Sequence, residues 1–366
     1  MKIGIVWLPN VGKSTLFNAL TKSYVADAAN FPFCTIDPNI GMVDVQDARL
    51  HQLAEVSGTQ NIIPATINFV DIAGLVKWAS AGEWLGNKFL SHIREVDAIV
   101  QVVRHFHDDD VVHVEWAPDP DRDRTIINDE LILADMQSLE KKLPERERKT
   151  KSQDKEALRT VDVIQRCLHE LEQGNLLNAL YEEMHEADQQ IVKSFHLLTT
   201  KSFVYALNIS EKDLAQASSI VQEYQQKRNK PVVAVCAKME AEMMDLDADD
   251  REVFLEEHQP ADGSALPTLH DLISCAFDAL GLMYYFTTGE KETRAWTVKK
   301  GSTAPQAAGV IHGDFERGFI RAETVQRDKF VEAWGRSGAK AKGYVRSEGK
   351  EYIVQDGDVM LFRFNV

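Results

Sequence analysis

The sequence has few cysteines, no long apolar run and no excess of positive charge. Its 366 residues include four cysteines that lie far apart and form no CxxC pair, so neither a disulfide framework nor a zinc site is expected. No run approaches the roughly 18 apolar residues of a membrane span. The N-terminal residues MKIGIV show no charged-then-apolar leader. These absences predict a cytoplasmic protein that does not enter a membrane.

Acidic residues outnumber basic ones, 57 to 41, which gives a formal net charge of −16. Such a field repels nucleic acid, so DNA is not an expected partner, and any polyanion must meet a locally basic surface. The stretch from Thr287 to the C-terminus is the least acidic part, with 14 basic and 11 acidic residues.

Short β-branched runs alternate with helical patterns over most of the first 280 residues. The runs are residues 2–6, 66–70, 98–103, 203–207 and 231–235. This alternation predicts an α/β fold with a mostly parallel sheet and helices on both faces.

Residues 126–199 interrupt this pattern. Apolar residues recur at spacings of three and four between Ile132 and Leu143 and again between Val161 and Leu171. Each set forms a stripe on one helix, and the polar stretch that holds Pro144 is expected to form the turn. We therefore expect an inserted antiparallel helical hairpin whose stripes pack against each other. The expected domains are an α/β domain of residues 1–125 and 200–280, the hairpin of 126–199, and a small β-rich module of 281–366.

The strongest functional signal is the segment from Trp7 to Ser14, WLPNVGKS, between a predicted strand and helix. In a phosphate-binding loop, backbone N–H groups at a helix N-terminus surround the phosphates. Lys13 would contact the β- and γ-phosphates, and the Ser14 hydroxyl would ligate Mg²⁺. The G-x-x-x-x-G-K-S pattern starts with glycine, where this sequence has Trp7. Taken alone, the segment also fits an ordinary helix N-terminus. The expected binding residues are Asn10, Val11, Gly12, Lys13, Ser14 and Thr15.

Further segments follow in the chain order of a GTPase-type domain. Asp71-Ile-Ala-Gly74 follows a predicted strand, so Asp71 would face Mg²⁺ through a water and Gly74 would donate its N–H to the γ-phosphate. Thr35 lies where a switch threonine that ligates Mg²⁺ is expected, although it also fits a plain loop. The ordered set favours the phosphate-loop interpretation over a chance match.

Two later segments are expected to hold the base. GTPases read guanine with Asn-Lys-x-Asp, whose aspartate accepts two hydrogen bonds. Here the segment is Asn208-Ile209-Ser-Glu211, without the lysine and with a carboxylate one methylene further out. Losing a paired contact removes most of the discrimination between bases, so ATP is expected over GTP. The alternative is a capped loop after the strand. The expected base-binding residues are Asn208, Ile209, Glu211, Cys236, Ala237 and Lys238.

The sequence resembles the YchF or Obg-like ATPases, a family of Obg-related P-loop nucleotide hydrolases of the translation-factor class. The matching segments are NVGKSTLFNAL (10–20), NFPFCT (30–35), FVDIAGLVK (69–77), RAWT (294–297), APQAAG (304–309) and GFIRA (318–322). The resemblance implies a G domain, an inserted antiparallel coiled coil, a C-terminal TGS module and a preference for ATP. It also implies ribosome association, with a role in translation and stress responses. We expect the contact to be on the large subunit, through rRNA or ribosomal protein.

Four tryptophans depart from the family pattern. Trp7, Trp78, Trp84 and Trp116 stand where similar sequences have glycine, and an indole cannot replace a residue that is there because it lacks a Cβ. Since UGA is read as Trp in some genetic codes and as Gly in others, our hypothesis is that the natural protein has glycine at these positions.

A water-positioning glutamine is missing after Gly74, where the residue is Leu75. A Ras-like enzyme has glutamine there, so slow intrinsic turnover is expected. The resemblance implies a histidine at His113, and a neutral imidazole suits orienting water. A structural histidine at a strand end is an equal alternative.

The expected function is therefore a ribosome-associated, Mg²⁺-dependent switch that hydrolyses ATP. The alternative is a nucleotide-binding scaffold with little or no hydrolysis. A metabolic kinase is disfavoured, because Asp71-Ile-Ala-Gly74 and the TGS-like tail are typical of switch proteins. The basic residues expected to face RNA, unless they are merely solvated, are Lys141, Lys142, residues 146–155, Lys299, Lys300, Lys340, Lys342 and Arg346.

Overall fold

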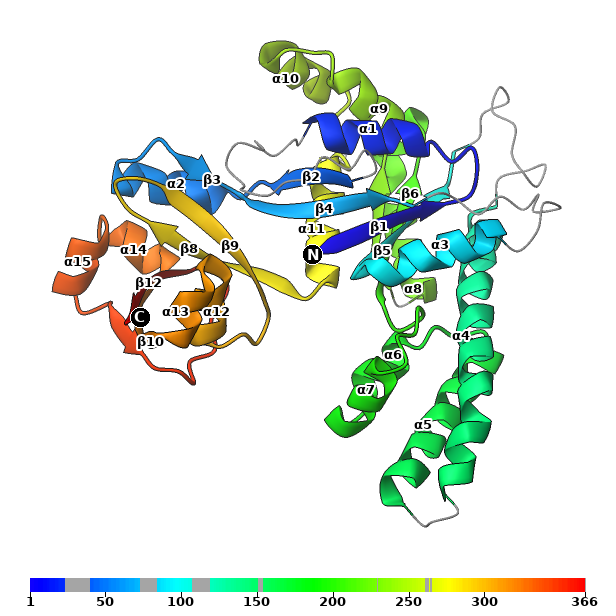
Figure 1. Cartoon of the computed structure of the whole chain (residues 1–366). Helices are drawn as coiled ribbons and strands as arrows, with labels where there is room; N and C mark the ends of the chain where they lie inside the picture. The colour runs from blue at the N-terminus through cyan, green and yellow to red at the C-terminus, as the bar shows by residue number, and fades with distance from the viewer. Residues whose placement is uncertain are drawn as a thin grey trace. The chain divides into compact units, whose positions relative to one another are not determined.

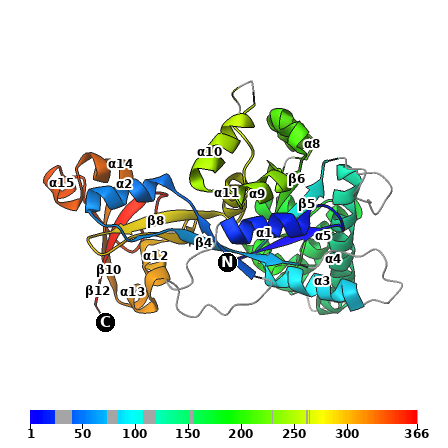
Figure 2. The ribbon, with the colours of Figure 1, turned by 90° about the horizontal axis from the view of Figure 1, so that it is seen from above.

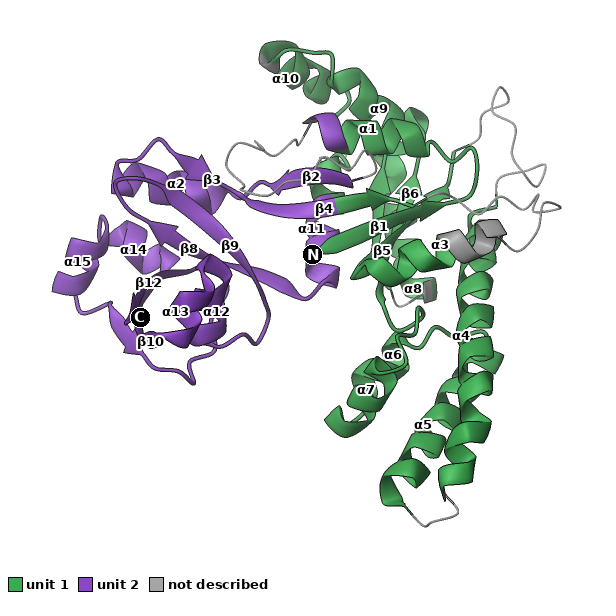
Figure 3. Ribbon diagram, viewed as in Figure 1, with its two compact units in different colours: residues 1–20, 69–272 green, residues 21–68, 273–366 purple. Residues whose placement is uncertain are grey.

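The computed structural model describes residues 1–23, 40–72, 84–106, 119–150, 154–228, 230–260, 263 and 265–365 (Figure 1). The chain divides into two compact units (Figure 3). Unit 1 comprises residues 1–20 and 69–272, and unit 2 comprises residues 21–68 and 273–366.

The first sheet has the strand order β2-β4-β1-β5-β6-β7. Its strands are β1 (Lys2–Trp7), β2 (Ile40–Val45), β4 (Ala65–Asp71), β5 (Ala98–Arg104), β6 (Ser202–Asn208) and β7 (Val232–Val235). Strands β1, β5, β6 and β7 run parallel, and β5 and β7 are buried along their whole length. Strands buried on both faces read as continuous apolar runs, which is the pattern that predicted this sheet.

Helices lie on both sides of the first sheet. In Figure 1, α1 (Lys13–Ser23) lies above the strands and α3 (Trp84–Glu95) lies below them, and the view from above in Figure 2 places α1 in front of the strands. The remaining elements of this part are η2 (Glu211–Gln216), α8 (Ala217–Arg228), α9 (Ala237–Met243), α10 (Ala248–Glu257) and α11 (Leu269–Ala279). The expected α/β architecture is confirmed.

The inserted hairpin is also confirmed. It consists of α4 (Pro120–Thr150) and α5 (Lys155–Glu172), followed by α6 (Asn178–Glu183) and α7 (Glu186–Lys193). Leu139 of α4 packs with Ile164 and Cys167 of α5 and with Val192 of α7. The turn was expected around Pro144, but α4 continues through it to Thr150. The charged residues after Pro144 are good helix formers, which moves the turn beyond Thr150.

The second sheet has the order β11-β10-β12-β8-β9-β3. Its strands are β3 (Ile62–Ile63), β8 (Leu282–Thr288), β9 (Thr293–Lys299), β10 (Phe319–Gln326), β11 (Arg346–Glu348) and β12 (Asp358–Phe364). One face packs through Tyr285 and Phe362 against α12 (Ala304–Ile311) and α13 (Gly313–Arg317). The other packs through Phe286 and Val359 against α2 (Ala48–Ser57), α14 (Arg327–Glu332) and α15 (Arg336–Ala341).

The compact units differ from the expected domain limits of 1–125 with 200–280, 126–199 and 281–366. Residues 21–68 group with the C-terminal unit. The reason is that Leu50 and Leu53 of α2 join the core of the second sheet. The hairpin has its own apolar cluster but groups with unit 1.

Candidate nucleotide-binding site

The loop between β1 and α1 has the backbone of a phosphate-binding loop. Asn10 and Gly12 both have positive φ, at 64° and 87°. A Cβ on Gly12 would lie 2.4 Å from the side-chain amide nitrogen of Asn208, so both the conformation and the close approach require glycine. The first turn of α1 holds no acidic residue, which leaves its N-terminal N–H groups and dipole available to an anion.

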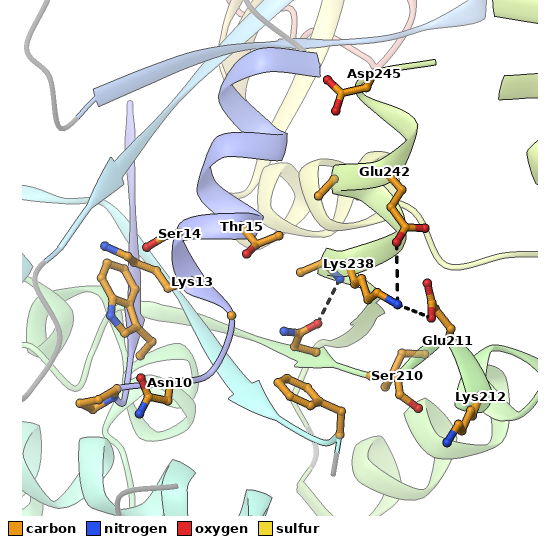
Figure 4. Close-up of a pocket in the computed structure, with 18 residues that line it drawn as sticks. Asn10, Lys13, Ser14, Thr15, Ser210, Glu211, Lys212, Lys238, Glu242 and Asp245 are labelled. Carbon is orange, nitrogen blue, oxygen red and sulfur yellow. Dashed lines mark hydrogen bonds and ion pairs between the residues drawn. The ribbon is translucent and has the colours of Figure 1, made fainter. Parts of the chain in front are cut away.

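A pocket of about 1180 Å³ opens beside this loop, at the carboxyl edge of the first sheet (Figure 4). Open α/β sheets bind their ligands at this edge. The pocket is lined by Trp7, Pro9, Asn10, Gly12, Lys13, Ser14, Thr15, Phe106, Asn208, Ile209, Ser210, Glu211, Lys212, Ala237, Lys238, Ala241, Glu242 and Asp245. Phosphate-side and base-side candidates thus line the same pocket.

Lys13 and Asp71 meet at the phosphate end. The Lys13 Nζ atom lies 3.0 Å from Asp71 Oδ2 and 4.3 Å from the centroid of the Trp7 ring. The Trp7 residue is buried, at 6% exposure. Mg²⁺ prefers oxygen ligands, so the carboxylate of Asp71 and the hydroxyl of Ser14, which lines the pocket, fit such an ion chemically.

Asn208 joins the two ends of the pocket. Its side-chain nitrogen donates to the Val11 carbonyl at 2.8 Å, and its side-chain oxygen accepts from the Ala237 N–H at 3.1 Å. Asn208 is 4% exposed, so these bonds are shielded from water. The residue therefore fixes the phosphate loop against the start of α9.

Glu211 and Lys238 form an ion pair at the base end. Lys238 Nζ lies 2.9 Å from a Glu211 carboxylate oxygen and 3.8 Å from Glu242 (Figure 4). The hydrogen bond from Lys238 to Glu211 raises the pKa of the lysine. The capping box that starts η2 is made by Ser210 and Asp213, so Glu211 is not needed as a cap. Glu211 instead lines the pocket.

Several expected residues lie away from the pocket lining or outside the described chain. Val11 is buried, and its carbonyl meets Asn208. Cys236 is buried at the start of α9, and burial raises the pKa of its thiol. Trp84 begins α3. The residues outside the described ranges are Thr35, Gly74, Leu75, Trp78, His113 and Trp116.

The structure adds residues that motif reasoning missed. Phe106 lines the pocket and follows the end of β5. Its position after a predicted strand is the one feature of the sequence that could have indicated this role. The buried guanidinium of Arg104 lies 4.4 Å from the Phe106 ring. It donates to the carbonyls of Phe106 and Asn10 at 3.1 and 3.4 Å. Arg104 therefore braces the phosphate loop from the neighbouring strand.

A phosphate loop after β1, a carboxylate beside its lysine, and a polar segment after β6 in the same pocket define a P-loop nucleotide hydrolase of the GTPase type. Two family models agree with this class. One, described as a 50S ribosome-binding GTPase, matches residues 2–127, and the YchF GTPase C-terminal model, described as a protein of unknown function, matches residues 282–365.

Known relatives match over the whole chain. The ribosome-binding ATPase YchF of Bacillus subtilis is 49% identical and covers 99% of both chains. Obg-like ATPase 1 of Gallus gallus is 41% identical, over 100% of this chain and 92% of the relative. The Schizosaccharomyces pombe YchF GTPase structure matches with a TM-score of 0.86 and 34% identity, over 99% and 97% of the two chains. This chain belongs to the YchF and Obg-like ATPase family.

The described helices include none that is both long and apolar enough to cross a membrane.

Proposed function

We propose that this protein is a cytoplasmic, ribosome-associated ATPase that acts as a Mg²⁺-dependent switch in translation or stress regulation. The observation that carries the proposal is the pocket that combines Lys13, Ser14 and the base-side segments. The names of its relatives, ribosome-binding ATPase YchF, support the ribosome as partner. We place the contact on the large subunit, through rRNA or ribosomal protein, which agrees with the description of the matching GTPase model.

The base-side contacts support a preference for ATP over GTP. A guanine-reading carboxylate must be free to accept from the ring N1–H and the exocyclic amine. Glu211 is instead paired with Lys238 at 2.9 Å. Ile209, at the lysine position of the guanine motif, is 2% exposed. A site without the paired contact discriminates weakly against adenine.

In the proposed mechanism, Lys13 binds the β- and γ-phosphates and backbone N–H groups of residues 10–15 hold the remaining oxygens. Ser14, Thr35 and Asp71 would hold Mg²⁺, which when bound neutralises phosphate charge. Gly74 would donate to the γ-phosphate, and His113 would orient the attacking water. Without a glutamine after Gly74, turnover is slow until the ribosome completes the site.

A second candidate, a nucleotide-binding scaffold with little or no hydrolysis, is favoured by one observation. The Trp7 ring lies beneath the Lys13 ammonium, where the phosphate-loop pattern has glycine. An indole here competes with phosphate for the lysine.

We also propose that the chain functions in three parts, with 126–199 as a coiled-coil arm and 281–366 as a TGS-like module.

One experiment separates these candidates. ATP and GTP compete for the purified protein, and turnover is measured with and without 50S and 30S subunits. We expect ATP to bind at least as tightly as GTP and 50S subunits to accelerate hydrolysis. Lys13→Ala should weaken ATP binding by about a hundredfold, since charged hydrogen bonds are among the strongest. Tight ATP binding without turnover under any condition would support the scaffold, and unchanged hydrolysis by Lys13→Ala would refute the phosphate-loop assignment.

A further inference from the structure

Three arginine side chains surround one carboxylate on the second sheet. Arg363 Nε of β12 donates to Glu323 Oε1 of β10 at 3.0 Å, and Arg336 Nη1 of α15 donates to Glu323 Oε2 at 3.2 Å. Arg321 Nη2 of β10 lies 3.9 Å from Glu323 Oε1. We call Arg321, Glu323, Arg336 and Arg363 the arginine cluster.

The cluster lies on an exposed end of a sheet face. Side chains alternate along a strand, so Arg321 and Glu323 share a face with Val325. Arg363 is paired with Arg321 in the β10–β12 register and lies beside it. Val325 is buried in the core beneath α2, α14 and α15, whereas the Arg321 and Arg363 side chains are 55% and 52% exposed. The helices thus bury one end of this face and leave the other to solvent.

The cluster carries an excess of positive charge. Three guanidinium groups face one carboxylate, and the hydrogen bond from Arg363 lowers the pKa of Glu323, which keeps that carboxylate ionised at neutral pH. About two positive charges remain without compensation inside the cluster, in a chain whose formal net charge is −16. Glu323 also restricts the guanidinium groups of Arg336 and Arg363, which donate hydrogen bonds to it, so less side-chain freedom is lost when they bind an anion.

Two of the lysines that the sequence singled out are each compensated by a single carboxylate. Lys300 pairs with Asp278 at 3.2 Å, and Lys342 pairs with Glu332 at 3.0 Å. These are one-to-one pairs on an exposed surface. A polyanion that approaches them has to displace a carboxylate, whereas the arginine cluster has charge in excess.

We propose that the arginine cluster binds the phosphodiester backbone of RNA. Guanidinium forks donate two parallel hydrogen bonds to phosphate oxygens. Two of them stand side by side on adjacent strands, which suits a continuous phosphate backbone lying across the sheet. Leu361 shares this face opposite Glu323 in the register and is 36% exposed, so it offers an apolar contact to ribose. The assignment of this RNA to the ribosome rests on the proposed function.

The test uses the full chain and a fluorescein-labelled 20-nucleotide RNA hairpin, followed by anisotropy over a series of salt concentrations. Arg321→Glu/Arg363→Glu should bind RNA about tenfold or more weakly. The negative slope of log affinity against log salt should become shallower by about 0.7–0.9 for each lost phosphate contact. The milder Arg321→Gln/Arg363→Gln should lie in between. The matched control, Lys291→Glu/Lys350→Glu, changes the charge equally at two exposed lysines of the same unit and should bind within about twofold of the parent. Urea unfolding confirms that each variant is folded.

Equal RNA binding by the cluster variants and the parent would overturn the proposal, as would an equal loss in the control. Poly-glutamate binding that disappears in the variants while RNA binding persists would assign the surface to acidic proteins instead. Co-sedimentation with ribosomes separates this proposal from the proposed function. A parent that binds the RNA hairpin through the cluster but does not sediment with ribosomes refutes the ribosome assignment alone. Cluster variants that sediment like the parent and keep RNA affinity refute the cluster alone.

Discussion

The phosphate end and the base end of the nucleotide pocket are held together in different ways. At the phosphate end, Lys13 makes a partly exposed ion pair with Asp71 and lies over Trp7. At the base end, Asn208 makes two buried hydrogen bonds to backbone groups. Water and salt weaken the first kind of contact and hardly reach the second. The contacts of Asn208 therefore form a fixed frame, while phosphate binding requires Lys13 to exchange partners.

The largest expected effect comes from removing the frame. Asn208→Ala leaves the Val11 carbonyl and the Ala237 N–H without their partner in a buried position. We expect the free energy of unfolding to fall by about 2–4 kcal/mol, measured by urea denaturation. ATP and GTP affinities should fall together, because the loop between Asn10 and Thr15 loses its support. A loss confined to one nucleotide would instead make Asn208 a reader of the base.

A buried carboxylate behind the base end should make stability depend on pH. Glu240 of α9 accepts from the Leu269 N–H at 2.8 Å, and burial raises its pKa to about 7, with a further increase from Asp271 opposed by Arg251. Because the folded-state pKa lies above the unfolded value, the folded protein binds more protons between about pH 4.5 and 7. The free energy of unfolding therefore falls as the pH rises through that window.

Glu240→Gln should remove this dependence. Urea unfolding at pH 5 to 8 should show a variant that is more stable than the parent above pH 7 by on the order of 1–3 kcal/mol, with the difference shrinking toward pH 5. Glu257→Gln, at an exposed position in α10, is the control and should follow the parent curve. Parallel curves for Glu240→Gln and the parent would exclude titration of Glu240 in this range.

The phosphate end should respond to removal of the indole. Trp7→Gly takes away the ring 4.3 Å from Lys13 Nζ and restores the glycine of the phosphate-loop pattern. We expect ATP affinity to rise about tenfold, or about 1.4 kcal/mol, by titration calorimetry. Trp7→Phe keeps an aromatic ring and should change affinity little. If both variants bind like the parent, the indole does not compete with phosphate.

The smallest effect is expected at a second tryptophan, in unit 2. Trp334 has a φ of 52°, which costs about 1 kcal/mol for a residue with a Cβ, and it is 75% exposed. Trp334→Gly should therefore raise the free energy of unfolding by up to about 1 kcal/mol and leave ATP affinity unchanged. The same substitution at positions 7 and 334 thus separates an effect on binding from an effect on the backbone. A lower free energy of unfolding in Trp334→Gly than in the parent would show that packing of the indole stabilises the fold.

The first sheet and the hairpin could be predicted because their signals are local. Buried parallel strands such as β5 appear as unbroken apolar runs, and the stripes of α4 and α5 repeat at helical spacing. The family resemblance was confirmed by the comparisons. The place of α2 in unit 2 could not be predicted, because its partners β8 and β9 lie far along the chain. The turn predicted at Pro144 was wrong because the helix-forming residues on either side offset the cost of a proline inside a helix.

The sequence predicted which residues line the candidate site better than it predicted which groups those residues contact. The motif identified Asn208 and Glu211 as pocket residues, and both line the pocket. An asparagine after a strand can face either a ligand or the backbone, and nothing local to Asn208 decides between them. The same holds for Glu211, whose partner Lys238 follows a different strand. The arginine cluster has no motif at all, since it forms from residues of β10, β12 and α15.

The grouping of residues 21–68 with the C-terminal unit has a consequence for synthesis. Helix α2 and strand β3 leave the ribosome early, but β8 begins at residue 282, roughly 220 residues after β3 ends. At about 5–20 residues per second, the wait is about 10–45 s. During that time the nascent chain presents Leu50 and Leu53, which pack against Phe286 and Ala295 in the finished protein, without those partners. A chain that stops before β8 would keep this apolar segment uncovered and be open to aggregation or degradation.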